Sequence, residues 1–273
     1  MKRLTEQASK YNDLEKKTVD ELVVGINAED QLVALAIQKV LPDLSRLITA
    51  IELQLKNGGR MFYLGCGSGG RLSVLDAIEL PNTYGIEEGI VNVVLAGGVE
   101  RLVDALEEME DDLTEGWETL QKAKISSKDI VVGISASGTT PYVLAALKQC
   151  RANGIPCGSI VSNPNSPISQ YSDYPVEVIT GPEFVTGSTR MKCGTAQKMI
   201  FDMISTTVMI RLGRVEGNCM VNVRLTNNKV LDRSVQMLME KEGLSDYEKA
   251  KKLILECGNV KKAVDYLHSH NKS

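Results

Sequence analysis

The chain has 273 residues, of which 43% are hydrophobic and 24% are charged, and its formal net charge is −4. This is the composition of an ordinary soluble globular protein, and the acidic balance argues against nucleic acid or an anionic membrane as a partner. The charged N-terminus, MKRLTEQASKYNDLEKK, does not resemble a secretory leader, and no run of about 18 apolar residues follows. We therefore expect a cytoplasmic protein without a membrane span.

The first sixty residues have a helical pattern. Thr18 and Glu21 fit a capping box, Asn27 is suited to cap a second helix, and a third helix is expected over 42–56. These helices define an N-terminal helical segment, residues 1–59, which we expect to pack on the domain that follows.

Five short apolar runs come next, at 60–65, 91–97, 129–134, 156–163 and 176–180. The segments around them are long enough for helices, which we expect at 71–80, 99–111, 116–123, 140–153 and 188–212. Nearly continuous apolar strands that alternate with helices predict βαβ units and a parallel sheet covered on both faces. The sequence therefore predicts an α/β domain over 60–223.

Beyond residue 223 the pattern changes again. Three short amphipathic stretches are separated by glycines, which predicts three helices. We expect them to form a small C-terminal helical appendage, residues 224–273.

The distribution of histidine and cysteine restricts the chemistry. The only histidines, His268 and His270, lie in the last six residues, and the six cysteines form no CxxC pair. Histidine is the commonest general base and transition-metal ligand, and scattered cysteines favour reduced thiols over disulfides or a zinc site. We therefore expect no metal or other cofactor, and acid–base chemistry by Glu, Asp, Lys, Tyr or Cys.

Two of the expected strands end in loops of small residues, G65-C-G-S-G-G-R71 and S135-A-S-G-T-T-P141. Ligands gather at the carboxyl ends of parallel strands, where backbone N–H groups and hydroxyls can hold phosphate. The candidate phosphate ligands are Gly67, Ser68, Ser135, Ser137, Gly138 and Thr140. For either loop alone, turn and cap residues without a ligand remain an alternative, and the single match to G-x-G-x-x-G is a weak dinucleotide signal.

A third candidate segment, GPEFVTGSTRMKCGTAQK (181–198), precedes the last long helix of the domain. It holds more polar side chains than a helix start needs, and Glu183, Ser188 and Lys192 are its candidate ligands. An ordinary helix start remains open. For Glu79 and for Glu110, within EEMEDD, a solvated helix face is the default interpretation from sequence alone.

Long ordered motifs nevertheless point to one family. GRLSVLDAIELPNTYG, ALEEMEDD, SGTTPYVLAALK, NPNSP and GPEFVTGSTRMKCGTAQKM make the sequence resemble the N-acetylmuramic acid 6-phosphate etherases, which are built on the sugar isomerase (SIS) domain. The resemblance covers nearly the whole chain. It implies a five-stranded parallel sheet flanked by helices, and a homodimer in amino-sugar catabolism and cell-wall recycling.

The resemblance also implies a lyase reaction that removes D-lactate from the C3 ether of an amino-sugar phosphate. Two glutamates carry the acid–base work in the family, and they fall on Glu79, as proton donor, and on Glu110, as its partner. The loops depart from the usual family pattern at Gly69, where a hydroxyl residue is common, and at Thr139, where an arginine is common. Two alternatives stay open: a regulatory protein that binds sugar phosphates without catalysis, and an aldose–ketose phosphate isomerase.

Overall fold

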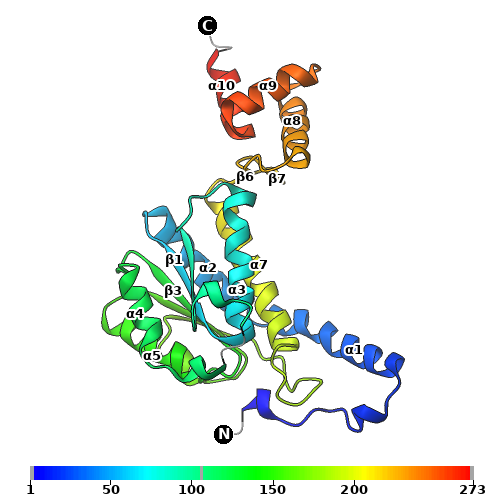
Figure 1. The fold of residues 1–273 in the computed structure, drawn as a ribbon, viewed down its shortest axis with the longest axis vertical. Coiled ribbons are helices and arrows are strands. Elements are labelled where there is room, and N and C mark those ends of the chain that lie inside the picture. Colours follow the sequence, from blue (N-terminus) through cyan, green and yellow to red (C-terminus); the bar gives the residue numbers. More distant parts are fainter. Residues whose placement is uncertain (1–2, 105–106, 271–273) are drawn as a thin grey trace. The chain divides into compact units, whose positions relative to one another are not determined.

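The computed structural model describes residues 3–104 and 107–270 (Figure 1). The chain divides into two compact units, of which the first holds Met1–Ala77 and Gly89–Ile204. The second holds Ile78–Glu88 and Ser205–Ser273. The N-terminal helices belong to the same unit as the sheet, and the domain boundaries expected after residues 59 and 223 stay a prediction.

The first unit is built on a parallel sheet, and the predicted fold class is confirmed. Its five strands, within residues 3–104 and 107–270, have the order β2-β1-β3-β4-β5. The strands span Met61–Gly65 (β1), Val91–Leu95 (β2), Ile130–Ser135 (β3), Cys157–Val161 (β4) and Tyr174–Glu177 (β5). Gly65 is in register with Leu95 on one side and Ile134 on the other. The loops that follow β1 and β3 therefore begin side by side.

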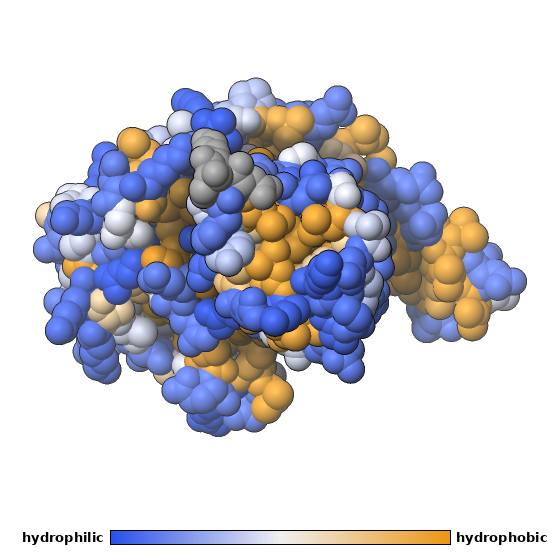
Figure 2. Space-filling model, turned by 90° about the horizontal axis from the view of Figure 1, so that it is seen from above, coloured by the Kyte–Doolittle hydropathy of each residue, from blue (hydrophilic) through white to orange (hydrophobic). Residues whose placement is uncertain are grey.

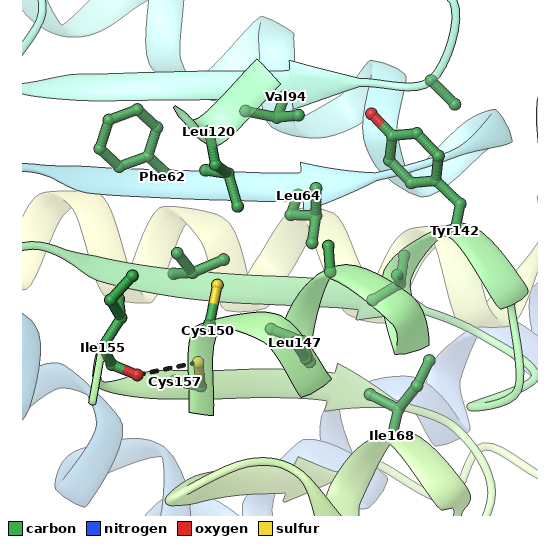
Figure 3. Packing of buried hydrophobic residues seen from close by; sticks show 14 of the residues in the cluster. Phe62, Leu64, Val94, Leu120, Tyr142, Leu147, Cys150, Ile155, Cys157 and Ile168 are labelled. Atoms are coloured by element: carbon green, nitrogen blue, oxygen red, sulfur yellow. Dashed lines mark hydrogen bonds between the residues drawn. The ribbon is translucent and has the colours of Figure 1, made fainter. Parts of the chain in front are cut away.

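Helices cover both faces of this sheet (Figure 1). On one face, α4 (Glu115–Lys122) and α5 (Pro141–Ala152) contribute Leu120 and Leu147 to a core that also holds Phe62 and Leu64 of β1 (Figure 3). The other face carries α2 (Leu41–Lys56), α3 (Gly67–Tyr84) and α7 (Lys192–Arg211).

Tyr63 shows why β1 is buried on both faces. It alternates with Phe62 and Leu64, and its ring centroid lies 5.1 Å from that of Phe201 in α7. Its hydroxyl donates a 3.1 Å hydrogen bond to Asp76 of α3.

The N-terminal part differs from expectation in one respect. The Thr18–Glu21 capping box is confirmed and begins α1, but this helix runs unbroken over Val19–Gln38. The second start expected at Asn27 is therefore wrong, and the Asn27 side chain accepts a 2.8 Å hydrogen bond from Gln31 one turn later. Two short 3-10 helices, η1 (Leu4–Glu6) and η2 (Leu14–Lys16), precede α1.

The helix expected over 99–111 is also wrong. The segment forms two short 3-10 helices, η3 (Val99–Arg101) and η4 (Glu107–Asp111), and residues 105–106 lie outside the described part. Val103, which follows η3, is 93% exposed, so it makes no apolar contact that would hold a longer helix on the sheet.

The second unit contains the predicted helical appendage. Among its described residues, α8 (Asn228–Glu242), α9 (Tyr247–Cys257) and α10 (Val260–His270) enclose a core of their own, which includes Leu238, Ile254 and Val264. A two-stranded hairpin of Val215–Glu216 (β6) and Cys219–Met220 (β7) precedes them. In the part of the chain that the structure describes, no helix is long and apolar enough to span a membrane.

A buried ion pair joins α1 to the start of α7. The side chain of Lys192 is 1% exposed and its ammonium group pairs with the carboxylate of Glu29, which is 7% exposed. Burial raises the pKa of Glu29, but the hydrogen bond and charge of Lys192, aided by Lys10, outweigh it and leave this pKa below its ordinary value of 4.5.

We predict that Glu29→Gln destabilises the protein by about 3 kcal/mol near neutral pH, because it leaves a buried ammonium group without its counter-charge. A pKa lowered by folding stabilises the protein above the unfolded-state value, and this stabilisation is lost as pH falls through the folded-state value. The difference in free energy of unfolding between wild type and Glu29→Gln should therefore narrow below about pH 4.5. Urea unfolding at pH values above and below 4.5 measures this difference. The control is Asp202→Asn, which breaks an exposed ion pair with Lys198. If the destabilisation by Glu29→Gln did not change with pH, the ion pair with Lys192 would not be its cause.

Candidate functional site

A cavity of about 460 Å³ opens at the carboxyl ends of β1 and β3, in the first unit. The loops after these two strands form its floor, and η4 and the segment 187–190 contribute to its wall. Among the predicted site residues, the structure places Gly67, Ser68, Glu110, Ser135, Ser137, Thr140 and Ser188 around this one cavity.

The loop after β1 brings the start of α3 to the cavity. Ser68 lies in the first helical turn, where backbone N–H groups have no partner within the helix. The structure also accounts for Gly69, the departure from the family pattern. A Cβ atom there would lie 2.9 Å from both the Gln197 side-chain oxygen and Ile134 Cγ2, so Gln197 occupies the space of the absent side chain.

Hydroxyl groups of the loop after β3 form a chain of hydrogen bonds. Thr140 Oγ1 donates to Glu110 Oε1 at 2.7 Å, and Ser135 Oγ lies 2.8 Å from Thr140 Oγ1. Because the single proton of Thr140 points to Glu110, the Ser135 hydroxyl must donate to Thr140. By the same reasoning Ser137 donates to Ser135 at 3.2 Å, and Thr139 Oγ1 donates to Ser137 at 3.1 Å. The chain thus runs in one direction and ends on the carboxylate of Glu110.

Gly138 shapes this loop from behind the cavity and is not among its lining residues in the described part of the chain. Its φ is +71°, and a Cβ atom would lie 2.4 Å from Ser166 Cβ, so no other residue fits without a shift. Its N–H donates a 3.0 Å hydrogen bond to Ser135 Oγ. Gly138 thereby holds Ser135 in the position that reaches Thr140.

Glu183 and Lys192 have internal partners. The Glu183 carboxylate is buried and accepts hydrogen bonds from the backbone N–H groups of Lys192 (2.8 Å) and Cys193 (2.9 Å) at the start of α7. Lys192 points to Glu29, as described above. Neither lines the cavity in the described part of the chain, and their role in binding substrate stays a prediction.

The N-terminal segment contributes to the cavity, which the sequence analysis missed. Arg3 and Glu6, at either end of η1, are lining residues. Asn163, which follows β4, holds this segment: its Oδ1 accepts from the N–H groups of Leu4 (2.6 Å) and Thr5 (3.4 Å). The only sequence signal was the NPNSP motif, because it places Asn163 at the same edge of the sheet as the two loops.

The same asparagine also holds the loop after β3. Its Nδ2 lies 3.1 Å from the carbonyl oxygens of both Ala136 and Ser137, and 3.0 Å from Thr5 Oγ1. One side chain therefore fixes η1 and the loop after β3 (residues 135–140, hereafter the serine loop) together.

Glu79 belongs to the second unit. It lies on α3, with an exposed side chain, one helical turn after Leu75. It is not among the residues described as lining the cavity.

Comparisons with known proteins agree with this fold. A model of the SIS domain matches residues 111–206, and a model described as the glucokinase regulatory protein N-terminal SIS domain matches residues 43–151. Among solved structures, a putative phosphosugar isomerase from Bacteroides fragilis is 19% identical, with a TM-score of 0.52, over 72% of this chain and 98% of that one. A phosphoheptose isomerase from Neisseria gonorrhoeae is 16% identical, with a TM-score of 0.55, over 70% and 98%. At such identities the likeness shows the fold alone.

Similarity to curated proteins is much higher. An N-acetylmuramic acid 6-phosphate etherase from Bacteroides thetaiotaomicron is 52% identical over 99% of this chain and 98% of its own length. Proteins of the same name from Porphyromonas gingivalis and a Geobacillus species are 51% and 42% identical, over 95% and 97% of this chain and 94% and 90% of their own lengths. The chain therefore belongs to the N-acetylmuramic acid 6-phosphate etherase family.

Proposed function

We propose that the protein is a carbon–oxygen lyase that cleaves the D-lactyl ether of N-acetylmuramic acid 6-phosphate. Its products would be N-acetylglucosamine 6-phosphate and D-lactate. The observation that carries the proposal is full-length membership of the etherase family together with Glu110, which is held at the cavity by Thr140. This membership favours an enzyme over a regulatory protein that only binds sugar phosphates.

The reaction requires two proton-transfer groups. In the open-chain sugar, the hydrogen on C2 is acidic because C2 lies next to the C1 aldehyde, so a base can remove it. The lactate oxygen on C3 then leaves, with a proton from an acid, and a double bond forms between C2 and C3. Water adds to C3 and C2 regains a proton, which gives N-acetylglucosamine 6-phosphate. Two carboxyl groups suffice for these steps.

We assign the removal of the C2 proton to Glu110. Its Oε1 accepts the hydrogen bond from Thr140, and Oε2 accepts none from another described residue. The hydroxyl chain therefore fixes one carboxylate oxygen and leaves the other for the substrate. Glu79 would protonate the departing lactate oxygen, as the family resemblance implies.

The same chain divides the loop residues into two roles. Ser135 and Thr140 use their hydroxyl protons within the chain, so we assign them to the alignment of Glu110. The contact between Ser137 and Ser135, at 3.2 Å, is the longest in the chain, so a phosphate oxygen would displace it most readily. Ser137, Ser68 and Ser188, with the N–H groups in the first turn of α3, are then the proposed phosphate ligands.

We further infer that the protein is a homodimer in which Glu79 serves the cavity of the partner subunit. Hydrophobic side chains are exposed along α1 and α3: Val19, Val23, Val24, Leu32 and Leu35 on α1, and Leu75 and Ile78 on α3. Figure 2 shows hydrophobic residues at the surface on the right, where Figure 1 places α1. A second copy of the chain would bury these side chains, and Glu79 shares the exposed side of α3 with Leu75.

The proposed setting is the cytoplasm, in amino-sugar catabolism and cell-wall recycling. Cys150, Cys157 and Cys193 are buried and form no disulfide, which suits a reducing compartment.

The first test is whether the purified protein releases D-lactate from N-acetylmuramic acid 6-phosphate, measured with a lactate dehydrogenase assay. Glu110→Gln should lower turnover by about a hundredfold or more, because the base is lost. Glu108→Gln, an exposed neighbour in η4, is the matched control and should keep near-normal turnover. A wild-type protein that binds the sugar phosphate and releases no lactate would support the regulatory alternative.

Mixed dimers test whether Glu79 acts across subunits. In a heterodimer of Glu79→Gln and Glu110→Gln chains, one cavity would hold both intact glutamates and the other neither. Unfolding and refolding an equal mixture should therefore recover about a quarter of wild-type turnover, since half of the dimers are mixed. If each site were formed within one chain, the mixture would stay as inactive as the two variants.

A further inference from the structure

Arg3 lies at the boundary between two cavities. It lines the cavity described above and also a second one, of about 430 Å³, whose other lining residues include Ser137, Thr139 and Asn163. Among the described residues, none forms a hydrogen bond or ion pair with the Arg3 guanidinium group. Arg3 is thus a cation beside the loop after β3 with which no residue of the described part of the chain pairs.

The position of Arg3 is set by its backbone. Thr5, two residues later, is fully buried, and Asn163 holds the N–H groups of Leu4 and Thr5. The carbonyl oxygen of Arg3 accepts a 3.1 Å hydrogen bond from the N–H of Glu6. The base of the Arg3 side chain is therefore held beside the loop although its guanidinium group is free to meet a ligand.

The charges around the first cavity show what Arg3 could bind. Four lining residues are charged: Arg3, Arg190, Glu6 and Glu110. Lys192 is turned away, into its pair with Glu29. The substrate proposed above carries a phosphate and a carboxylate, so it needs cations, and the loop from Ser135 to Thr140 contains none.

We propose that Arg3 binds the phosphate group held on the Ser135–Thr140 loop and supplies the cation that this loop lacks. This inference rests on the proposed function. Guanidinium binds phosphate through two parallel hydrogen bonds, which would also orient the phosphate on the loop. Thr139 lines the second cavity together with Arg3, so the cation reaches this place from the N-terminal segment and not from the loop.

The test compares binding and turnover in Arg3→Ala. We expect KM for N-acetylmuramic acid 6-phosphate to rise about tenfold or more, with kcat within about twofold, because a hydrogen-bonded charge contact to the substrate is lost. Calorimetric titration with N-acetylglucosamine 6-phosphate, which has the phosphate but no lactyl carboxylate, should show a similar rise in Kd. Arg46→Ala, which removes an exposed arginine paired with Asp43 on α2, is the control and should change neither.

A rescue variant separates a charge contact from a structural effect. Thr139→Arg introduced into Arg3→Ala would place a guanidinium group at the same wall of the second cavity. We expect it to restore most of the lost affinity for N-acetylglucosamine 6-phosphate. Absence of any rescue, with thermal unfolding lowered in Arg3→Ala, would overturn the proposal in favour of a structural role.

Two further outcomes overturn it. Unchanged affinity of Arg3→Ala for both sugar phosphates would show that Arg3 does not bind substrate. Weaker binding of N-acetylmuramic acid 6-phosphate alone would place the lactyl carboxylate, and not the phosphate, on Arg3. The proposed function fails if the wild-type protein releases no lactate. The titration with N-acetylglucosamine 6-phosphate tests Arg3 independently of that result, because it requires no turnover.

Discussion

The side-chain amide of Asn163 is the contact on which the rest of the site depends. It follows β4, so the sheet fixes its position, and it joins Leu4 and Thr5 to the carbonyl oxygens of Ala136 and Ser137. Asn163 is 4% exposed, and its loss would leave the N–H group of the buried Thr5 without this partner, at a cost of about 1–3 kcal/mol. Asn163 thereby holds the serine loop and η1, which both line the cavity, in fixed positions relative to each other.

From that loop a chain of hydrogen-bonded hydroxyl groups leads to the carboxylate of Glu110, the proposed base. η4 is short, and Met109 packs it against the core of the first unit. The hydrogen bond from Thr140, in turn fixed by Ser135, then holds the carboxylate of Glu110. The proposed role of Arg3 also depends on Asn163, which holds the N–H groups of the next two residues, Leu4 and Thr5. In the proposed reaction, substrate binding and proton transfer would therefore both depend on residues that follow β3 and β4.

The sequence predicted those features that local pattern determines. Continuous apolar runs indicated the five strands of the parallel sheet. Of these, β1, β3 and β4 are buried throughout, and the edge strands β2 and β5 are partly buried. The loops of small residues were expected from their place after β1 and β3. Glu110 could be chosen from EEMEDD only by family resemblance, since its distinguishing contact is with Thr140, thirty residues away. Lys192 became a candidate ligand because it lies in a segment rich in polar residues. Its partner Glu29 lies 163 residues away in the chain, so the local sequence did not reveal their ion pair. The place of Arg3 likewise depends on Asn163, a contact that no local pattern reveals.

In the proposed reaction, Glu110 removes the C2 proton while Glu79 assists departure of lactate. The most direct test follows the hydrogen on C2 of N-acetylmuramic acid 6-phosphate by NMR in D₂O, with both glutamine variants. We predict that Glu79→Gln exchanges this hydrogen for deuterium but releases almost no lactate, whereas Glu110→Gln neither exchanges the hydrogen nor releases lactate. Exchange at C2 by Glu110→Gln at the wild-type rate would contradict it.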